Sequence, residues 1–166
     1  MFSAMSEYGP LIAAVIAPHL GGLAGAFITK REVPEWYETL RKPDWRPPNW
    51  MFGPVWGTLY TSMGVASYLV WRDGGGFSGD AKLPLALYGT QLALNWAWTP
   101  IFFGAHKKGM ALVDIIALWG TIGGCIYTFW SINHKASYLM IPYIAWVTLA
   151  SALNYCIWRD NRDKKD

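Results

Sequence analysis

The sequence predicts an all-α integral membrane protein, built as a bundle of five transmembrane helices in a single domain. Three observations lead to this prediction. Five long runs are almost free of charged residues, only 15% of the 166 residues are charged, and the chain contains 11 Trp and 9 Tyr. Soluble domains carry about 25% charged residues. Trp and Tyr are favoured where an apolar region meets water, as at a membrane interface or a ligand pocket.

The five runs are the expected spans, and each is 22 to 25 residues long. A helix that crosses a bilayer needs about 20 apolar residues. The spans cover residues 8–29, 47–71, 83–105, 109–133 and 136–158. At the C-terminus, residues 160–166 are expected to form a disordered basic tail. A soluble helix would show a charged face at its helical period, and a β-barrel strand would alternate over about 10 residues. The runs show neither pattern.

The distribution of Lys and Arg predicts the orientation of the bundle. Five spans place the termini on opposite sides of the membrane. The side of the N-terminus carries 3 Lys and Arg residues, and the side of the C-terminus carries 11. Positive charge accumulates on the cytoplasmic side, so we expect a cytoplasmic C-terminus. No basic segment with a cleavage motif precedes the first run, so we expect that run in the mature protein.

The segments between the spans differ in character. The first loop, residues 30–46, carries Trp36, Tyr37, Leu40 and Trp45 among its charges, which predicts a short helix over the pocket at the end of the bundle. An anchor in the lipid headgroups is the alternative. Small residues recur at a spacing of four in four spans: Ala17, Gly21, Gly25; Gly53, Gly57; Gly89, Ala93, Ala97; Gly120, Gly124. We expect them to pack helices together, and the third set is also suited to a homodimer.

The composition argues against several functions. A net charge of +3 without a recognisable basic motif argues against a nucleic-acid partner. Cys125 and Cys156 lie in apolar runs and do not have metal-site spacing. His19 lacks a second ligand at helical spacing, so we expect a hydrogen-bonded histidine and not a metal or haem ligand. Asp114 is the one acid within a span, and we expect it to contact the first loop.

Three segments resemble the translocator protein family, also called the peripheral-type benzodiazepine receptor or tryptophan-rich sensory protein, in its eukaryote-like form. They are Trp36-Tyr37 with residues 42–50 and 53–60, residues 91–98 with 100–104, and residues 153–160. These segments read WY, KPDWRPPNW and GPVWGTLY, then QLALNWAW and PIFFG, then LNYCIWRD. With the five spans, the resemblance covers almost the whole chain.

The resemblance implies a membrane receptor linked to sterol or porphyrin transport. The implied ligands are protoporphyrin IX or haem, cholesterol, and drugs of the benzodiazepine and isoquinoline carboxamide types. Bound porphyrin is expected as a ligand, with no required cofactor. Eukaryotic members lie in the mitochondrial outer membrane with a cytosolic C-terminus, in contact with membrane lipid. A homodimer and the voltage-dependent anion channel are the implied protein partners.

The resemblance also implies pocket residues: Ala26, Phe52, Gly53, Trp56, Asn95, Met110 and Trp146. Indole rings offer a flat face and an N–H donor, although both Trp residues could instead fill a core. At about 100° per residue, Ala150 and Leu153 lie within about 40° of Trp146 on the fifth span, so we assign them to the same pocket. Asn95 is expected either to hydrogen-bond a ligand carbonyl or to join helices. Mammalian members usually carry Trp at the position of Met110.

Leu153, Tyr155 and Arg159 fit a cholesterol motif, which is weak alone but is the assigned sterol segment in this family. Tyr155 and Arg159 lie on the opposite side of the helix from Trp146. We therefore expect two surfaces, an inner stripe for porphyrin or drug and an outer face for a sterol. The alternative for Arg159 is an anchor that reaches the headgroups.

Two other functions compete with that of a receptor. Bacterial relatives are linked to light-dependent porphyrin breakdown, so a porphyrin-degrading enzyme using Trp56 and Trp146 is the main alternative. The sequence contains no recognisable catalytic set for ordinary acid, base or nucleophilic chemistry. A structural adaptor for other membrane proteins is the third hypothesis.

Overall fold

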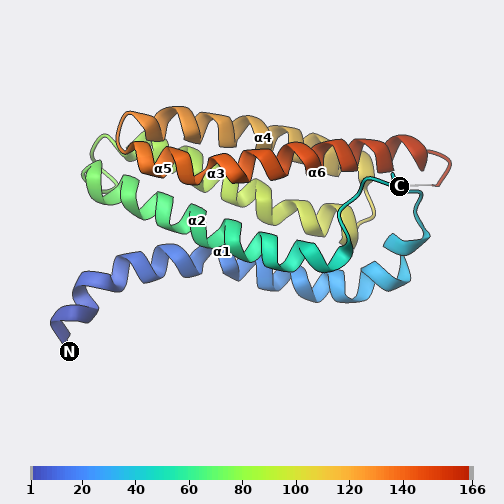
Figure 1. Cartoon of the computed structure of the whole chain (residues 1–166), viewed down its shortest axis with the longest axis horizontal. Helices are drawn as coiled ribbons and strands as arrows, with labels where there is room; N and C mark the ends of the chain where they lie inside the picture. The colour runs from blue at the N-terminus through green and yellow to red at the C-terminus, as the bar shows by residue number, and fades with distance from the viewer. Residues whose placement is uncertain (1, 165–166) are drawn as a thin grey trace.

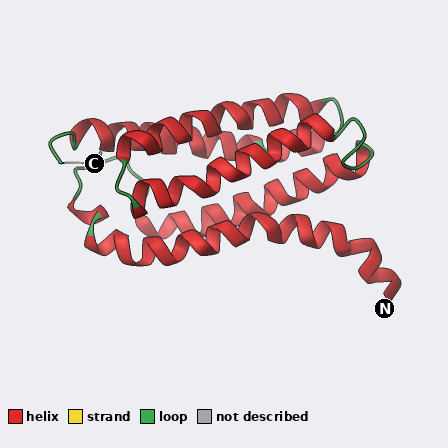
Figure 2. Cartoon of the chain, turned by 180° about the vertical axis from the view of Figure 1, so that it is seen from behind, coloured by secondary structure: helices red, strands yellow, loops and turns green. Residues whose placement is uncertain are grey.

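The computed structural model describes the backbone of residues 2–164 and the side chains of residues 6–164. Five long helices run along one another and leave the loops at the two ends (Figures 1 and 2). They are α1 (Phe2–Glu35), α2 (Asn49–Asp73), α3 (Lys82–Thr99), α4 (Lys108–Trp130) and α6 (Ile141–Asp160). Shorter elements are η1 (Tyr37–Thr39), η2 (Pro100–Gly104) and α5 (His134–Leu139). The described residues form no strand.

Helix is the expected state of these runs, because a helix pairs its backbone polar groups within a single segment. Three helical stretches are long and apolar enough to cross a membrane: Ser6–Glu35, Lys108–Trp130 and His134–Asp160. The last stretch combines α5 and α6. Helices α2 and α3 cover two of the expected uncharged spans, although neither is among these three stretches.

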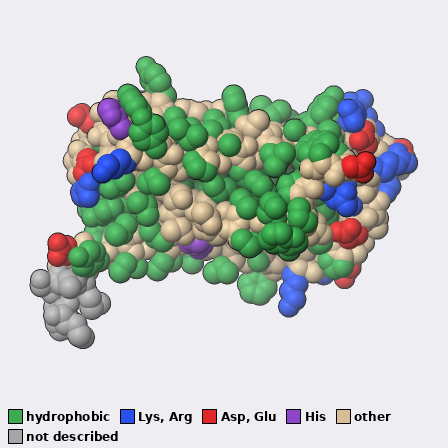
Figure 3. Space-filling view, viewed as in Figure 1, with side chains coloured by type: hydrophobic (Ala, Val, Ile, Leu, Met, Phe, Trp, Pro, Cys, Tyr) green, Lys and Arg blue, Asp and Glu red, His purple; other side chains and the backbone are tan. Residues whose placement is uncertain are grey.

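The surface of the bundle carries large apolar side chains. Phe27, Val113 and Tyr127 are all strongly exposed. In Figure 3 charged side chains gather at the two ends of the molecule, and hydrophobic side chains are spread between them. A soluble monomer rarely exposes apolar surface on this scale. The surface, together with the long apolar helices, is that of a multi-pass membrane protein.

Helix α1 is longer than the expected span at both ends and contains Pro10, Pro18 and Pro34. Its N-terminal part diverges from the other helices (Figure 1). Proline removes a backbone donor and bends a helix. At the other end α1 continues through Lys30 and Arg31, so the first loop begins later than we expected.

The first loop also contains less helix than we expected. It forms only the three-residue 3-10 helix η1, and it continues in extended and turn conformation to α2. Pro43, Pro47 and Pro48 explain this difference, because proline fixes its own backbone angle and disfavours helix at the residue before it.

The expected disordered tail is wrong for its described part. Asn161 is completely buried and Asp163 pairs with Arg41 of the first loop. The charges in this segment indicated solvation, but Asp163 and Lys164 have partners more than 100 residues away in the sequence. Lys165 and Asp166, the last residues of the expected tail, lie outside the described residues.

The small-residue stripes serve three different purposes. A Cβ atom added to Gly21 would collide with the Trp96 indole ring, and one added to Gly64 would lie 2.6 Å from the Ala14 carbonyl oxygen. These glycines therefore allow α1 to approach α2 and α3. For Gly21 this is the bundle packing that we expected, whereas Gly64 was not in a predicted stripe. An added Cβ at Gly89 or Gly57 would meet no atom within 4 Å. Gly89 lies on the outer surface, and Gly57 lines an internal cavity.

Candidate functional site

A cavity of about 550 Å³ lies among the helices, on the side of the bundle toward the first loop. Its volume is within the range of roughly 300 to 1,000 Å³ that is usual for small-molecule sites. Its wall combines residues from α1, α2, α3, α4 and α6 with residues from η1 and η2. Most of the wall is apolar or aromatic, with a few polar groups, which is the composition of a site for an apolar ligand.

Eight of the nine predicted pocket residues line this cavity: Ala26, Phe52, Gly53, Trp56, Asn95, Trp146, Ala150 and Leu153. The exception is Met110, whose side chain is 55% exposed on the outside of α4. The prediction that Met110 lines the pocket is therefore wrong for this structure. Helix α4 presents its buried face through Ala111, Ile115 and Leu118, and the last two reach the cavity.

Aromatic rings form one wall of the cavity. The Trp146 ring meets the Phe52 ring edge to face, with centroids 5.5 Å apart. The Trp56 ring lies 5.4 Å from the Tyr60 ring. Trp146 Nε1 is buried and has no hydrogen-bond partner among the described residues. A buried indole N–H usually has a partner, so Trp146 Nε1 is an unsatisfied donor on a side chain that lines the cavity.

The three residues predicted to share one face of α6 do lie on one face of this helix. Trp146, Ala150 and Leu153 all line the cavity, because they recur at helical spacing on one face. The same spacing continues to Asn154 and Ile157, which the sequence analysis did not include. Other lining residues that were not predicted include Trp98, Phe102, Phe103, Ile115 and Leu118. Their positions depend on how neighbouring helices turn toward one another.

A chain of buried hydrogen bonds borders the cavity and joins three helices. The Tyr60 hydroxyl donates to Asn95 Oδ1 over 2.8 Å, and Asn95 Nδ2 donates to the Tyr143 hydroxyl over 2.7 Å. Tyr143 in turn donates to Gln91 Oε1 over 2.7 Å. Asn95 thus joins α2, α3 and α6, one of the two roles expected for it. An amide has a second N–H, so joining helices does not preclude a bond to a ligand.

Known proteins of similar sequence identify the family of this chain. The model of the TspO/MBR family matches residues 14–159. The human translocator protein is 48% identical over 152 residues, which cover 92% of this chain and 90% of the human protein. The chain belongs to the TspO/MBR family. The tryptophan-rich protein TspO of Archaeoglobus fulgidus is 42% identical over 150 residues, covering 89% of this chain and 94% of its own length. Protein CrtK of Rhodobacter capsulatus is 39% identical over 131 residues, covering 78% and 81%.

In this TspO/MBR protein, half-buried aromatic and polar side chains lie next to the cavity at its loop end. The Trp36 ring stacks on the His106 ring with centroids 4.0 Å apart, and His106 Nε2 lies 2.8 Å from Glu32 Oε2. These contacts join the end of α1 to the connection between η2 and α4. Lys42 Nζ donates to the carbonyl oxygens of Tyr37 and Leu40. Burial lowers the pKa of Lys42, and Glu38 opposes this effect.

The expectations for His19 and Asp114 have different outcomes. His19 Nε2 lies 3.1 Å from the Thr61 hydroxyl, so it is hydrogen-bonded as we expected, and it also lines the cavity. The described residues contain no group of His, Cys, Asp and Glu that could hold a metal ion. The expected contact of Asp114 with the first loop is wrong, because its Oδ2 is buried and has no partner among the described residues.

The three residues of the predicted sterol motif are divided between two surfaces. Leu153 is buried in the cavity wall, whereas Tyr155 is 45% exposed on the outside of α6. The Arg159 guanidinium lies 5.8 Å from the Tyr155 ring centroid and pairs with Asp160 over 2.7 Å. The structure therefore places Tyr155 and Arg159 together and separates both from Leu153.

Proposed function

We propose that this protein is a membrane receptor or translocator that binds a flat, largely apolar ligand in the cavity among its helices. Porphyrins such as protoporphyrin IX, sterols and isoquinoline carboxamides have the required chemistry. The observation that carries the proposal is the 550 Å³ cavity with an aromatic wall and the partnerless Trp146 N–H. The names of the relatives, translocator protein and tryptophan-rich protein, agree with a membrane translocator of this kind.

The proposal includes a position in the membrane. All five long helices cross the bilayer, since each expected uncharged span corresponds to one long helical stretch. The end that contains the first loop, the α3–α4 connection and the C-terminal segment carries most of the basic residues. This bias supports a cytosolic C-terminus. By family resemblance, we place the protein in the mitochondrial outer membrane.

The polar groups of the cavity favour one orientation of the ligand. Asn95 and Tyr60 already bond each other inside the bundle, whereas Tyr37 and Asn49 line the loop end, beside the charged first loop. Burial of an unpaired carboxylate costs far more than burial of a hydrogen-bonded carbonyl. A porphyrin would therefore place its ring against Trp56 and Trp146 and its carboxylates at the loop end.

Filling the cavity tests this proposal. Replacing Gly57 with leucine adds a side chain where an added Cβ meets no atom within 4 Å, so the helix stays intact while the cavity loses volume. We expect the affinity for protoporphyrin IX to fall at least tenfold, with no loss of thermal stability. Titration of Trp fluorescence in detergent or nanodiscs measures the affinity.

The matched control is Gly120→Leu, which makes the same change on an exposed part of α4 that also has open space around it. This control should bind as the wild type does. Equal affinity in Gly57→Leu and wild type would show that the ligand does not occupy this cavity.

We propose that the outer face of α6 is a separate contact surface for a sterol. A sterol would lie against the exposed Tyr155 ring, with its hydroxyl near Arg159. Replacing Tyr155 with serine should weaken cholesterol binding severalfold and leave porphyrin affinity within twofold, because Tyr155 does not line the cavity. Parallel titrations with the two ligands measure this. Equal losses for both ligands would contradict the separation of the two surfaces.

A further inference from the structure

The C-terminal segment 161–164 crosses to the first loop and pairs with its backbone. Asn161 Oδ1 accepts from the backbone N–H of Arg41 over 2.9 Å, and Asn161 Nδ2 donates to the Arg41 carbonyl over 2.9 Å. The same Nδ2 donates to the Ile157 carbonyl over 2.8 Å. A single buried side chain thus satisfies both backbone groups of a loop residue that is 120 positions away.

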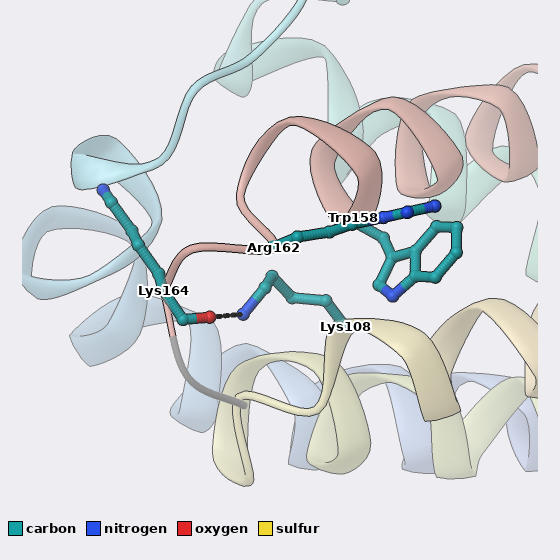
Figure 4. A pocket seen from close by; sticks show the side chains of 4 residues that line it. All are labelled: Lys108, Trp158, Arg162 and Lys164. Carbon is teal, nitrogen blue, oxygen red and sulfur yellow. Dashed lines mark hydrogen bonds between the residues drawn. The ribbon is translucent and has the colours of Figure 1, made fainter.

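Further bonds join this segment to the loop and to α4. The Arg41 guanidinium bonds the Asp160 carbonyl and pairs with Asp163 over 3.0 Å. Lys164 Nζ donates to the Thr39 carbonyl over 2.6 Å, and the Lys164 carbonyl accepts from Lys108 Nζ over 3.3 Å. Figure 4 shows the Lys164 side chain extending away from Lys108 while its carbonyl faces that ammonium group. The segment therefore links the loop to two helices.

The loop residues held by these bonds, Thr39 and Arg41, are close in the chain to Tyr37, which covers the loop end of the cavity. Tyr37 lines the cavity and is only 6% exposed. Its ring lies 5.5 Å from the Phe103 ring, and Leu40 is buried beside it. Because Arg41 follows Leu40 directly, fixing the Arg41 backbone also restricts Tyr37 and Leu40.

We propose that Asn161 is a positioning residue that holds the first loop closed over the ligand cavity, with the C-terminal segment acting as a clasp. The inference rests on the proposed function only where it concerns ligand exchange. Asn161 dominates this clasp because it is fully buried and its bonds are protected from water, whereas the Arg41–Asp163 pair is exposed. Opening the clasp exposes the loop end of the cavity, so a ligand enters and leaves faster.

Hydrogen exchange of the ligand-free protein tests the clasp directly. In Asn161→Ala, amide protection of residues 36–46 should fall about tenfold, while protection in the middle of α2 and α3 stays unchanged. The matched control is Asn133→Ala, which removes an asparagine that caps α5 at the opposite end of the bundle. The control should leave residues 36–46 as in wild type. Unchanged loop protection in Asn161→Ala would overturn the proposal.

Ligand kinetics provide a second measurement on the full-length protein. Stopped-flow mixing with protoporphyrin IX should show that Asn161→Ala raises the dissociation rate about tenfold and also raises the association rate. A general loss of folded protein would instead reduce the amplitude without raising the association rate. Unchanged rates with a loosened loop would overturn the gating role of Asn161. If the wild type does not bind porphyrin, the proposed function is wrong. The hydrogen-exchange measurement on residues 36–46 would still test whether Asn161 holds the loop.

A second variant serves if Asn161→Ala does not fold. Asn161→Ser keeps a short polar side chain, which cannot make both bonds to the Arg41 backbone. It should loosen residues 36–46 more than Asp163→Asn, which removes only an exposed ion pair. If Asp163→Asn loosens the loop as much as Asn161→Ser, the clasp depends on the ion pair and our assignment to Asn161 is wrong.

Discussion

Replacing Trp146 with alanine is expected to lower the affinity for protoporphyrin IX about a hundredfold. The substitution removes a large aromatic surface from the cavity wall and the one indole donor there that is buried without a partner among the described residues. Loss of this contact area and of one hydrogen bond amounts to about 3 kcal/mol. Titration of absorbance or of the remaining Trp fluorescence in nanodiscs measures the change.

The control for Trp146 is Trp50→Ala. Trp50 is 72% exposed on α2 and does not line the cavity, so its removal tests the general effect of losing an indole. We expect the affinity of this variant to stay within twofold of wild type. Equal affinities in Trp146→Ala and Trp50→Ala would mean that porphyrin binds elsewhere.

Replacing Gly64 with leucine is expected to disrupt the bundle. An added Cβ at Gly64 would lie 2.6 Å from both the Ala14 carbonyl oxygen and the Val15 Cα. Backbone atoms cannot move aside as a flexible side chain does, so α1 must separate from α2. We expect a loss of about 3 kcal/mol or more, and a Tm lower by about 10 °C. The ligand affinity should fall as well, because α1 forms one wall of the cavity.

Thermal unfolding monitored by size-exclusion chromatography measures the effect at Gly64. Gly89→Leu is the control, because Gly89 is exposed on α3 and an added Cβ meets no atom within 4 Å. Leucine favours helix over glycine, so the Tm of this control should stay the same or rise slightly. A Tm for Gly64→Leu equal to that of wild type would show that α1 and α2 are not packed this closely.

The two glycines show why a spacing pattern was not sufficient. Gly57 and Gly64 are both glycines on α2, and the sequence grouped Gly57 with packing residues. In the structure Gly64 carries the close contact with α1, and Gly57 opens into the cavity. A small residue allows either close approach or empty space. The neighbouring helix decides between them.

Met110 shows the corresponding limit for site residues. Family resemblance assigned it to the pocket together with residues that do line it. Helix α4 starts at Lys108, and its buried face runs through Ala111 and Ile115, so Met110 points outward. The rotation of a helix about its own axis depends on its contacts with the other helices. A motif match does not contain that information.

The sequence by itself determined the helical spans, the stripe of Trp146, Ala150 and Leu153, and the family. The spans and the stripe depend on the absence of charge over about 20 residues and on the fixed period of a helix, and the family rests on short motifs. All of these are local properties. Only the tertiary structure decided which polar residues meet. The Tyr60–Asn95–Tyr143 chain and the pairing of Asn161 with Arg41 join positions that are 35 to 120 residues apart. Such contacts depend on how five helices pack together, which no single segment of the sequence specifies.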